Sequence, residues 1–353
     1  MRAGQLEAVG AAPAASWADC LDAAGLERVN GLIAPAALAR VMALGATLPA
    51  LPGGGLECHL TDRERVDAAV RLLPDDGGRD ALLGRHETLR FAPALLSYPQ
   101  WPRLRALGER WVASGTPENR ELTSLWLEFD LPAAGSVSVP SLFIGCRPLP
   151  SQERPEPGWI AESAALLAGP QGAAAVRAGL QRWNARAPAG AQLAFVGLML
   201  SRQEKGVRLV HKGLDIDTLY GQVMALGWCG DGEAMLQALR QLVPEQAALA
   251  LHCDFSPDLG PRIGVEIALP GHPRYTPGWQ QLLQGLVGHG VCTEAAAAAL
   301  TQWPGLTAAG DEAWRGRPFA PPRGIVRRIN HIKLTFEPEQ PIQAKAYLYC
   351  GLL

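Results

Sequence analysis

The sequence predicts an α+β fold, an antiparallel β-barrel of repeated ββαα units with its helices outside. Three observations support this fold class. Hairpin-like segments of one pattern recur along the chain, helical segments separate them, and each predicted strand has one apolar and one polar face. A doubly wound parallel sheet would instead alternate single strands with helices. Consecutive hairpins form an antiparallel sheet, and closing that sheet into a barrel removes its exposed edges.

The hairpin pattern is clearest in three segments, 124–146, 249–269 and 331–349. Each contains an alternating strand, an acidic residue and a proline, a short turn, a second proline and another alternating strand. Period-2 alternation between turn residues is the signal of a hairpin. A fourth segment, 192–213, alternates less regularly, and a short strand at 56–60 could be the remainder of a fifth hairpin.

Segments of helical character lie between the hairpins. Residues 161–186 predict two short helices that divide near Gly169 and Pro170. Residues 215–243 and 277–303 each predict a pair of helices, and Thr293 is the expected start of the last one. The order is therefore hairpin, helix pair, hairpin, helix pair.

We expect a single domain over residues 1–353. Its first part, 1–120, is typical of mainly helical structure and includes a helix at 103–114. The hairpins and helix pairs of 121–353 would form the barrel. A chain of 353 residues supplies ample apolar material for such a core.

The composition gives the protein no broad electrostatic attraction to nucleic acid or to an anionic membrane. Charged residues make up 19% of the chain, and the formal net charge is −2. The seven cysteines form no CxxC pair, which argues against a disulfide framework or structural zinc. We identify no apolar run that suits a signal peptide or a membrane span. We therefore expect a soluble, cytoplasmic protein in which any phosphate site is local.

The two faces of the predicted strands indicate where a site would lie. One face of 124–131 is apolar, whereas the other contains Trp126 and Glu128. The helices need apolar surfaces to pack on, so the polar faces either line a barrel interior or contact solvent, as in an open sheet with one wet side. Trp126, Tyr347 and Tyr349 on the polar faces favour an interior.

Lysine and arginine side chains on the polar faces predict a pyrophosphate site. The densest group is Gln343-x-Lys345-x-Tyr347-x-Tyr349, in which all four side chains lie on one side of one strand. The tyrosine rings could shield an allylic carbocation by cation–π attraction. The alternative is a solvated Lys/Tyr strand face with cross-strand pairs. The cations that could hold a pyrophosphate by charge-assisted hydrogen bonds are Arg208, Lys212, Arg262, Lys333 and Lys345.

Carboxylates on the same faces are candidates for proton transfer. Glu128, near Trp126, is a candidate base for the proton of an aromatic acceptor. Asp130 and Asp254 each lie shortly before a proline, so we interpret both as turn-flanking carboxylates.

Histidines on the polar faces do not predict a metal site. His252, Asp254 and His331 lack the spacing of a known ligand set. We expect no bound metal, and we place His252 and Glu266 in an acceptor pocket. The sequence contains no GxGxxG loop, Walker loop or GxSxG nucleophile elbow.

Over residues 100–353 the pattern resembles the ABBA prenyltransferases, whose barrel (the PT-barrel) is built from ββαα repeats. It is most similar to their dimethylallyltryptophan synthase-like branch. In that branch a glutamate in the first barrel strand binds the ring N–H of the acceptor. Leu127-Glu128-Phe129-Asp130 stands in that place, so the resemblance implies a catalytic Glu128.

The same branch has Lys-x-Tyr or Arg-x-Lys-x-Tyr strands that bind pyrophosphate and shield the cation. Lys345-Ala346-Tyr347 matches this motif. The strand at Arg262 keeps only the arginine, and Arg208 and Lys212 lack the tyrosine that follows. The cation shield implied by the resemblance is therefore incomplete.

The resemblance implies prenyl transfer from an isoprenyl pyrophosphate to an aromatic or peptide acceptor in the lumen, in secondary metabolism and without a cofactor or essential Mg²⁺. The shield and acceptor pocket would include Trp126, Gln343, Tyr347, Tyr349, His252 and Glu266. One alternative is a non-catalytic barrel that binds a small molecule or peptide in a biosynthetic complex. Another is an enzyme of different chemistry that uses the acidic residues, such as a metal-assisted lyase.

Overall fold

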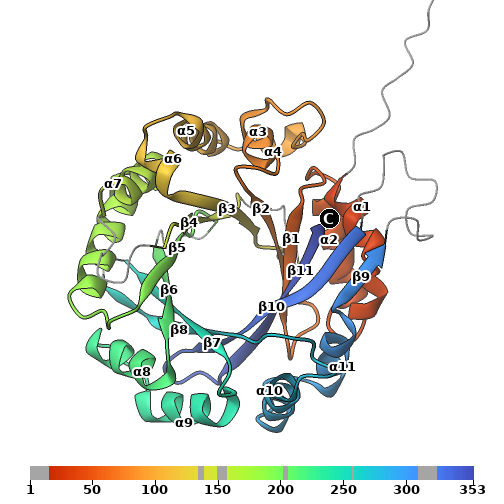
Figure 1. The fold of residues 1–353 in the computed structure, drawn as a ribbon, viewed down its shortest axis with the longest axis vertical. Coiled ribbons are helices and arrows are strands. Elements are labelled where there is room, and N and C mark those ends of the chain that lie inside the picture. The colour runs from red at the N-terminus through yellow and green to blue at the C-terminus, as the bar shows by residue number, and fades with distance from the viewer. Residues whose placement is uncertain (1–15, 134–138, 149–156, 202–205, 257, 309–323) are drawn as a thin grey trace, which may run out of the picture.

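A computed structural model describes residues 16–133, 139–148, 157–201, 206–256, 258–308 and 324–353. Within this part of the chain, ten antiparallel strands close into a barrel, and the helices surround it (Figure 1). Sequential strands are neighbours from β1 to β8. The barrel then closes through β10 and β11, and β11 pairs with β1. The predicted fold class is confirmed, and closure excludes the open sheet with one wet side.

Four of the five hairpins coincide with the segments that the sequence predicts. Within the first two of these hairpins, residues 134–138 and 202–205 of the connecting turns lie outside the described residues. The strands of these hairpins are β3 (Leu122–Phe129) and β4 (Ser141–Cys146), β5 (Gln192–Leu198) and β6 (Val207–Leu214), β7 (Ala248–Phe255) and β8 (Leu259–Ala268), and β10 (Gly324–Phe336) and β11 (Gln343–Leu352).

A fifth hairpin lies in the region that the sequence indicates to be mainly helical. It consists of β1 (Gly53–His59) and β2 (Val66–Leu72). The sequence predicts only a short strand at 56–60 there. Three glycines begin β1 and have no side chains to show alternation, and β2 has alanine on both faces. The hairpin is essential to the barrel, because β1 pairs with β11 and β2 pairs with β3.

The helices of the N-terminal part cover the outside of the first strands. They are α1 (Trp17–Ala23), the 3₁₀ helix η1 (Leu26–Val29), α2 (Pro35–Gly45), α3 (Gly78–Leu83), α4 (Pro93–Leu96), α5 (Trp101–Val112) and α6 (Pro117–Glu121). Ser16 caps α1 by accepting a hydrogen bond from the N–H of Asp19, and the Asp19 carboxylate accepts one from Ser16 in return.

The helices between the later hairpins follow the predicted pairs. They are α7 (Pro157–Asn184), α8 (Ile216–Ala225), α9 (Gly232–Leu242), α10 (Pro277–Gly288) and α11 (Glu294–Gln302). Within α7, Gly169 has φ 78° and divides the run into two helices, as predicted. Thr293 caps α11 through its side-chain oxygen, also as predicted.

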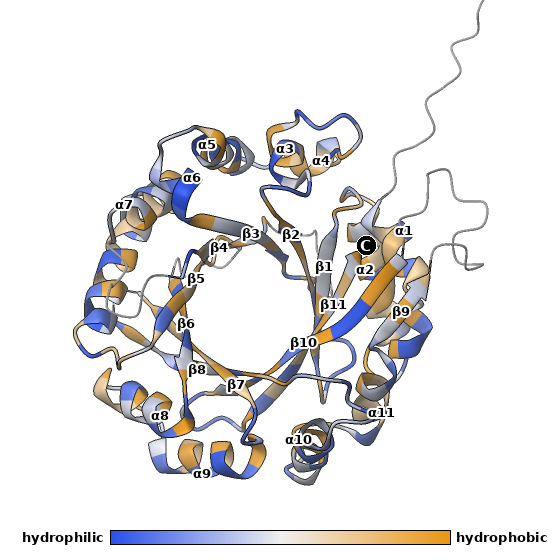
Figure 2. Ribbon diagram, viewed as in Figure 1, coloured by the Kyte–Doolittle hydropathy of each residue, from blue (hydrophilic) through white to orange (hydrophobic). Residues whose placement is uncertain are grey.

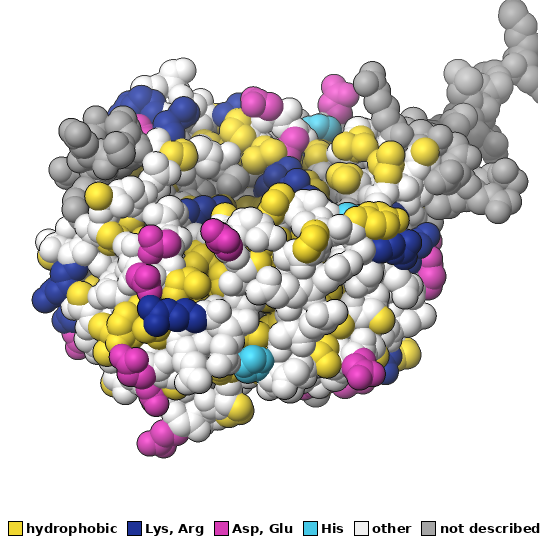
Figure 3. Space-filling view, turned by 60° about the horizontal axis from the view of Figure 1, so that its bottom comes forward, with side chains coloured by type: hydrophobic (Ala, Val, Ile, Leu, Met, Phe, Trp, Pro, Cys, Tyr) yellow, Lys and Arg dark blue, Asp and Glu magenta, His cyan; other side chains and the backbone are white. Residues whose placement is uncertain are grey.

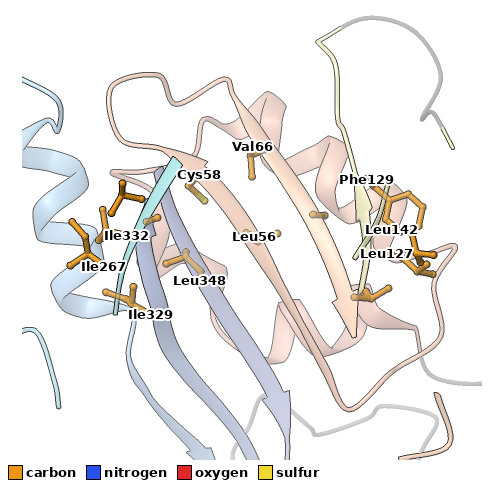
Figure 4. Packing of buried hydrophobic residues seen from close by; sticks show 14 of the residues in the cluster. Leu56, Cys58, Val66, Leu127, Phe129, Leu142, Ile267, Ile329, Ile332 and Leu348 are labelled. Atoms are coloured by element: carbon orange, nitrogen blue, oxygen red, sulfur yellow. The ribbon is translucent and has the colours of Figure 1, made fainter. Parts of the chain in front are cut away.

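The core lies between the outer barrel surface and the helices. The barrel strands contain both hydrophobic and hydrophilic residues (Figure 2). Their apolar side chains are buried on the face that meets the helices. Leu56, Leu127, Phe129, Ile267 and Leu348 belong to this layer and are at most 2% exposed (Figure 4). Full burial of one such side chain contributes about 1.5–3 kcal/mol, so the helices fix the barrel by many such contacts.

The C-terminal hairpin departs from simple alternation. A register shift between Ile329 and His331 leaves Asn330 as a bulge in β10, so residues on either side of it face the lumen. The first residues of β10 extend beyond the barrel and pair with a further strand, β9 (Gly305–Ala308).

The outer surface has no dominant charge. Figure 3 shows positive and negative side chains interspersed with apolar ones on one face, in agreement with a net charge of −2. No helix in the described part of the chain is long and apolar enough to cross a membrane.

Candidate active site

The barrel lumen contains a pocket of about 460 Å³. Its lining combines aromatic rings with ionisable groups from strands on all sides of the barrel. The aromatic rings are Trp126, Phe143, Phe195, His331 and Tyr347, and the charged or titratable groups include Glu57, Glu128, Lys212, His252, Glu266 and Lys333. Of the residues that the sequence predicts for the site, those lining this pocket are Trp126, Glu128, Lys212, His252, Glu266, Lys333 and Tyr347.

A hydrogen-bonded chain of three ionisable groups, Lys333, His252 and Glu266, runs along one wall of the pocket, and His331 lies beside its end. Lys333 Nζ lies 3.0 Å from His252 Nδ1, and His252 Nε2 lies 2.6 Å from a carboxylate oxygen of Glu266. His331 Nε2 lies 3.2 Å from the same oxygen. Because an ammonium only donates, Lys333 donates to His252, which then donates to Glu266 through Nε2–H.

Burial shapes the ionisation of this chain. It lowers the pKa of Lys333 to about 7, and the positive charge of Arg208 acts in the same direction. Burial also lowers the pKa of His252 to about 4, assisted by the charge of Lys333. Burial alone would raise the pKa of Glu266, but the charges of His331 and His252 outweigh it and lower that pKa. The chain therefore holds a lysine that can exist neutral or charged near pH 7.

Glu57 is a pocket carboxylate that the sequence interpretation missed. It lies on β1, opposite Tyr347 of β11, and accepts a hydrogen bond from Lys345. Burial would raise the pKa of Glu57, but the charges of Lys345 and Lys333 outweigh it and hold that pKa below its usual range. The partners are almost 290 residues apart in the chain, so only the closing pair of strands brings them together.

Glu128 does not lie in the first barrel strand. It projects from β3, the third strand, while the glutamate of the first strand, β1, is Glu57. The motif placement in the sequence interpretation was wrong because it overlooked the β1–β2 hairpin. Both carboxylates line the pocket, so each remains a candidate for contact with an acceptor.

At the end of the lumen where the hairpin turns lie (the turn end), the predicted cations are paired with carboxylates. Arg208 donates two hydrogen bonds to Asp254, at 2.6 and 2.8 Å. Asp254 is half-buried near the end of β7, and it pairs with Arg208 across the sheet in addition to flanking the turn. Asp130 accepts a hydrogen bond of 2.6 Å from Ser201.

Four predicted residues lie away from the pocket lining at the same end. Arg262 is exposed and forms an ion pair with Glu337 at 3.1 Å outside the pocket lining, so its role in a pyrophosphate site stays a prediction. Gln343 pairs with Thr335 at the beginning of β11 and does not line the pocket. Lys345 is bonded to Glu57, which lines the pocket, whereas neither Arg208 nor its partner Asp254 lines it.

At the opposite end, where strands lead into helices (the helix end), cations contact aromatic rings. Lys212 Nζ lies 5.5 Å from the centre of the Phe195 ring. Arg71, which the sequence interpretation missed, donates a hydrogen bond of 3.1 Å to the hydroxyl of Tyr349. The guanidinium of Arg328 lies 4.3 Å from the centre of the Tyr349 ring. These contacts are typical cation–π geometry.

Comparison with known proteins was made for families, curated sequences and structures. No family model and no curated protein matches the sequence. A search of solved structures finds prenyltransferase PriB in a ternary complex with L-tryptophan and dimethylallyl thiolodiphosphate. It covers 96% of each chain, with a TM-score of 0.54 and 15% identity. The chain has the fold of the ABBA aromatic prenyltransferases.

A second structure of this fold is 5-dimethylallyl tryptophan synthase from Streptomyces coelicolor, in complex with DMASPP and tryptophan. The two chains match over 95% of each, with a TM-score of 0.53 and 14% identity. The apo form of PriB matches equally well, with a TM-score of 0.53. The likeness to ABBA prenyltransferases predicted over residues 100–353 therefore extends over almost the whole chain.

The described part of the chain does not bring potential metal ligands together. No set of three or more His, Cys, Asp or Glu side chains there is arranged to hold a metal ion. The ionisable groups of the pocket instead bond to one another, as in the chain from Lys333 to Glu266.

Proposed function

We propose that this protein transfers a prenyl group from an isoprenyl pyrophosphate to an aromatic acceptor in the barrel lumen. The observation that carries the proposal is a closed barrel whose pocket brings aromatic rings, Glu128 and Lys333 together. The fold likeness supports this reading, since structures of this fold hold tryptophan and a dimethylallyl thiolodiphosphate. The acceptor class extends to peptides with an aromatic side chain.

The reaction begins with cleavage of the donor's C1–O bond, and pyrophosphate leaves with the electron pair. The rings of Trp126, Phe143 and Tyr347 stabilise the allylic carbocation by cation–π attraction and exclude water from it. A carbon of the acceptor ring then attacks C1. Lysine and arginine groups of the chain neutralise the leaving group, so we propose that Mg²⁺ is not essential.

The carboxylates of the pocket orient the acceptor and help to remove its proton. Glu128 on β3 and Glu57 on β1 both face the lumen, where a carboxylate can accept a hydrogen bond from a ring N–H or O–H. We assign the acceptor contact to Glu128, which lies two residues from Trp126 on the lumen face of β3. After the attack, the acceptor ring loses a proton to a base. We assign this role to Glu128, which lies two residues from Trp126 on β3.

A direct test is to incubate the protein with dimethylallyl or geranyl pyrophosphate and tryptophan, tyrosine or short aromatic peptides. Mass spectrometry should show an acceptor heavier by the prenyl group, and a phosphate assay should show released pyrophosphate. Glu128→Gln should reduce kcat by about 10²–10⁴-fold, with donor affinity unchanged. The absence of product with every pair, together with no donor protection against thermal unfolding, would exclude the proposal.

A non-catalytic binding barrel is the other function considered from the sequence. Mutually paired charges without an open cavity would favour it. The pairs exist, as between Lys345 and Glu57, but a pocket of about 460 Å³ lies beside them. The cavity therefore favours the prenyl transfer proposal.

A further inference from the structure

Lys333 of β10 reaches across β8 to a histidine of β7. Its Nζ lies 3.0 Å from Nδ1 of His252, and the residue opposite His252 on the intervening strand is Gly264. A Cβ at Gly264 would lie 2.5 Å from Cε of Lys333 and 3.1 Å from Cβ of His252. Any larger residue at this position would push the lysine away from the histidine. The glycine therefore permits a contact that spans three strands.

Lys333, His252 and Glu266 have the arrangement of a nucleophile, a base and a group that orients the base. His252 Nε2 lies 2.6 Å from a carboxylate oxygen of Glu266, which fixes the ring and leaves Nδ1 as the nitrogen that faces Lys333. All three residues line the pocket. A neutral lysine amine donates an N–H to Nδ1 and keeps its lone pair for a ligand.

The surroundings of Lys333 favour this neutral amine. Lys345 lies directly opposite it in the sheet and bonds to the carboxylate of Glu57, whereas the bonded partner of Lys333 is an imidazole. Burial, and next the positive charge of Arg208, lower the pKa of Lys333 to about 7. A buried lysine beside other cations is a setting in which an amine attacks a carbonyl carbon.

The lining next to Lys333 suits a flat aromatic ligand. His331 lies two residues before Lys333 on β10, and its ring centre lies 4.2 Å from that of Tyr347. Both rings line the pocket, as do the small side chains of Ala248 and Ala250 on β7. Aromatic rings pack well against other planar rings, and small side chains leave room for them.

We propose that Lys333 is a nucleophile that condenses with an aromatic aldehyde in the lumen to form an imine. This activity goes beyond the proposed prenyl transfer and does not depend on it. The lone pair of Nζ forms a bond to the carbonyl carbon, which gives a carbinolamine. The nitrogen loses two protons and the carbonyl oxygen gains two, and His252 carries them from one atom to the other. The C–O bond then breaks, and the oxygen leaves as water.

The charges along the chain of three groups suit this proton transfer. Burial is the main cause of the low pKa of His252, and the charge of Lys333 adds to it. That second cause disappears when the lysine is neutral, which is the state that attacks. The charge of Glu266 favours the protonated imidazole and remains. His252 is therefore a stronger base at the step in which it is needed.

Reductive trapping with benzaldehyde tests the proposal. The whole chain is incubated near neutral pH with limiting benzaldehyde and cyanoborohydride, which reduces an imine to a stable secondary amine. We expect mass spectrometry to show one benzyl group per chain, and peptide mapping to place it on Lys333. Lys212 is the internal control, because it lines the same pocket and is exposed. Trapping at Lys333 should be at least about tenfold faster, because the attack needs a neutral amine.

Two variants test the neighbours of Lys333. His252→Gln should slow trapping at Lys333 by about 10²-fold or more, because it removes the base, and Gly264→Ala should also slow it, because it displaces the lysine. Trapping at Lys212 should not change in either variant, and melting temperatures establish that each is folded. In the wild type, the trapping rate at Lys333 should rise as the pH rises through about 7.

The wild type alone can overturn the proposal. Equal rates at Lys333 and Lys212, or a benzyl group on other amines but not on Lys333, would show that the buried amine is no special nucleophile. Preferred trapping at Lys333 with an unchanged rate in folded His252→Gln would also overturn it, because the histidine would then carry no protons. Loss of the label in Lys333→Met, with trapping at Lys212 unchanged, would support it.

Discussion

The two ends of the lumen use their cations differently. At the turn end, Arg208 and Lys345 bond to carboxylates inside the barrel. At the helix end, Arg71, Arg328 and Lys212 contact aromatic rings. A cation bonded to a carboxylate holds two strands together and has few donors left. A cation on an aromatic ring keeps its donors, because the ring takes none of them. The difference shows that a cation in a barrel lumen can either join two strands through an ion pair or keep its donors available for a ligand.

Lys333, which lies opposite Lys345 in the sheet, is intermediate between these two cases. Lys333 bonds to a neutral histidine, His252, and not to a carboxylate. Burial lowers its pKa to about 7, so its charge changes near neutral pH. This lysine can therefore respond to a bound anion, which would favour its charged form.

Removal of Asp254 should have the largest effect on stability. Arg208 has a side chain that is only 8% exposed, so Asp254→Ala would leave a buried, unpaired guanidinium. We expect the free energy of unfolding in urea to fall by about 3–5 kcal/mol. Asp217→Ala, which breaks an exposed pair with Arg240, is the control and should cost less than about 1 kcal/mol.

The double variant Arg208→Met with Asp254→Ala should recover most of the stability lost in Asp254→Ala, because no buried charge remains. A loss below about 1 kcal/mol in Asp254→Ala would mean that the turn-end pair does not hold the barrel together, and the contrast between the two ends would fail.

Stability should also decrease as the pH falls from 6.5 to about 4. Burial and the charge of Lys333 lower the pKa of His252 to about 4 from 6.5. The unfolded chain therefore binds a proton in this range that the folded chain does not, and folding stability is lost as pH falls. The shift corresponds to about 3 kcal/mol for this residue.

Urea unfolding at several pH values between 7 and 4 measures the effect. His252→Gln, which keeps a donor and an acceptor in place, should flatten the profile in that range. His289→Gln changes an exposed histidine at the end of α10 and should leave the profile as it is. An equal slope in both variants would show that His252 does not carry the pH dependence.

At the helix end, loss of a cation should cost little. Arg328 is exposed, and its guanidinium lies 4.3 Å from the centre of the Tyr349 ring. Arg328→Gln should lower the unfolding free energy by about 0.5–1 kcal/mol, the value of an exposed cation–π contact. A loss as large as that expected for Asp254→Ala would make this arginine structural and erase the distinction between the ends.

The smallest effect should come from Arg262. Its ion pair with Glu337 lies in solvent, with the arginine side chain 47% exposed. Arg262→Ala should change the unfolding free energy by less than about 1 kcal/mol, and donor binding should not change. A clear loss of donor affinity in this variant would restore Arg262 to the site that the sequence predicted.

The sequence predicted the fold well where strand faces alternate. The apolar residues Leu249, Leu251 and Cys253 recur at period 2, and the structure buries all three against helices. It failed at Gly53–His59, where three glycines leave no pattern to read. Because this hairpin was overlooked, the strand of Glu128 was taken as the first barrel strand, whereas the glutamate of the first strand is Glu57.

The site was harder to predict than the fold. The alternation of the strands predicted that Trp126, Lys333 and Tyr347 face the lumen, and all three line the pocket. The sequence did not show which cations form ion pairs. Partners such as Arg208 and Asp254 belong to different hairpins, and only the sheet register brings them together. A lone cation in a sequence gives no sign of whether a carboxylate or a ring will face it.

The pairing of β1 with β11 has a consequence for the order of events in folding. The two strands are separated by almost 300 residues, so the last ladder of the barrel is also its least local contact. A nascent chain that has reached β10 has no enclosed lumen, because β11 supplies both Lys345 and Tyr347 and joins the two edges. Until then, β1 and β10 present free strand edges to other chains. We expect synthesis of the final hairpin to be the moment at which the nascent chain loses its tendency to aggregate and first acquires a pocket.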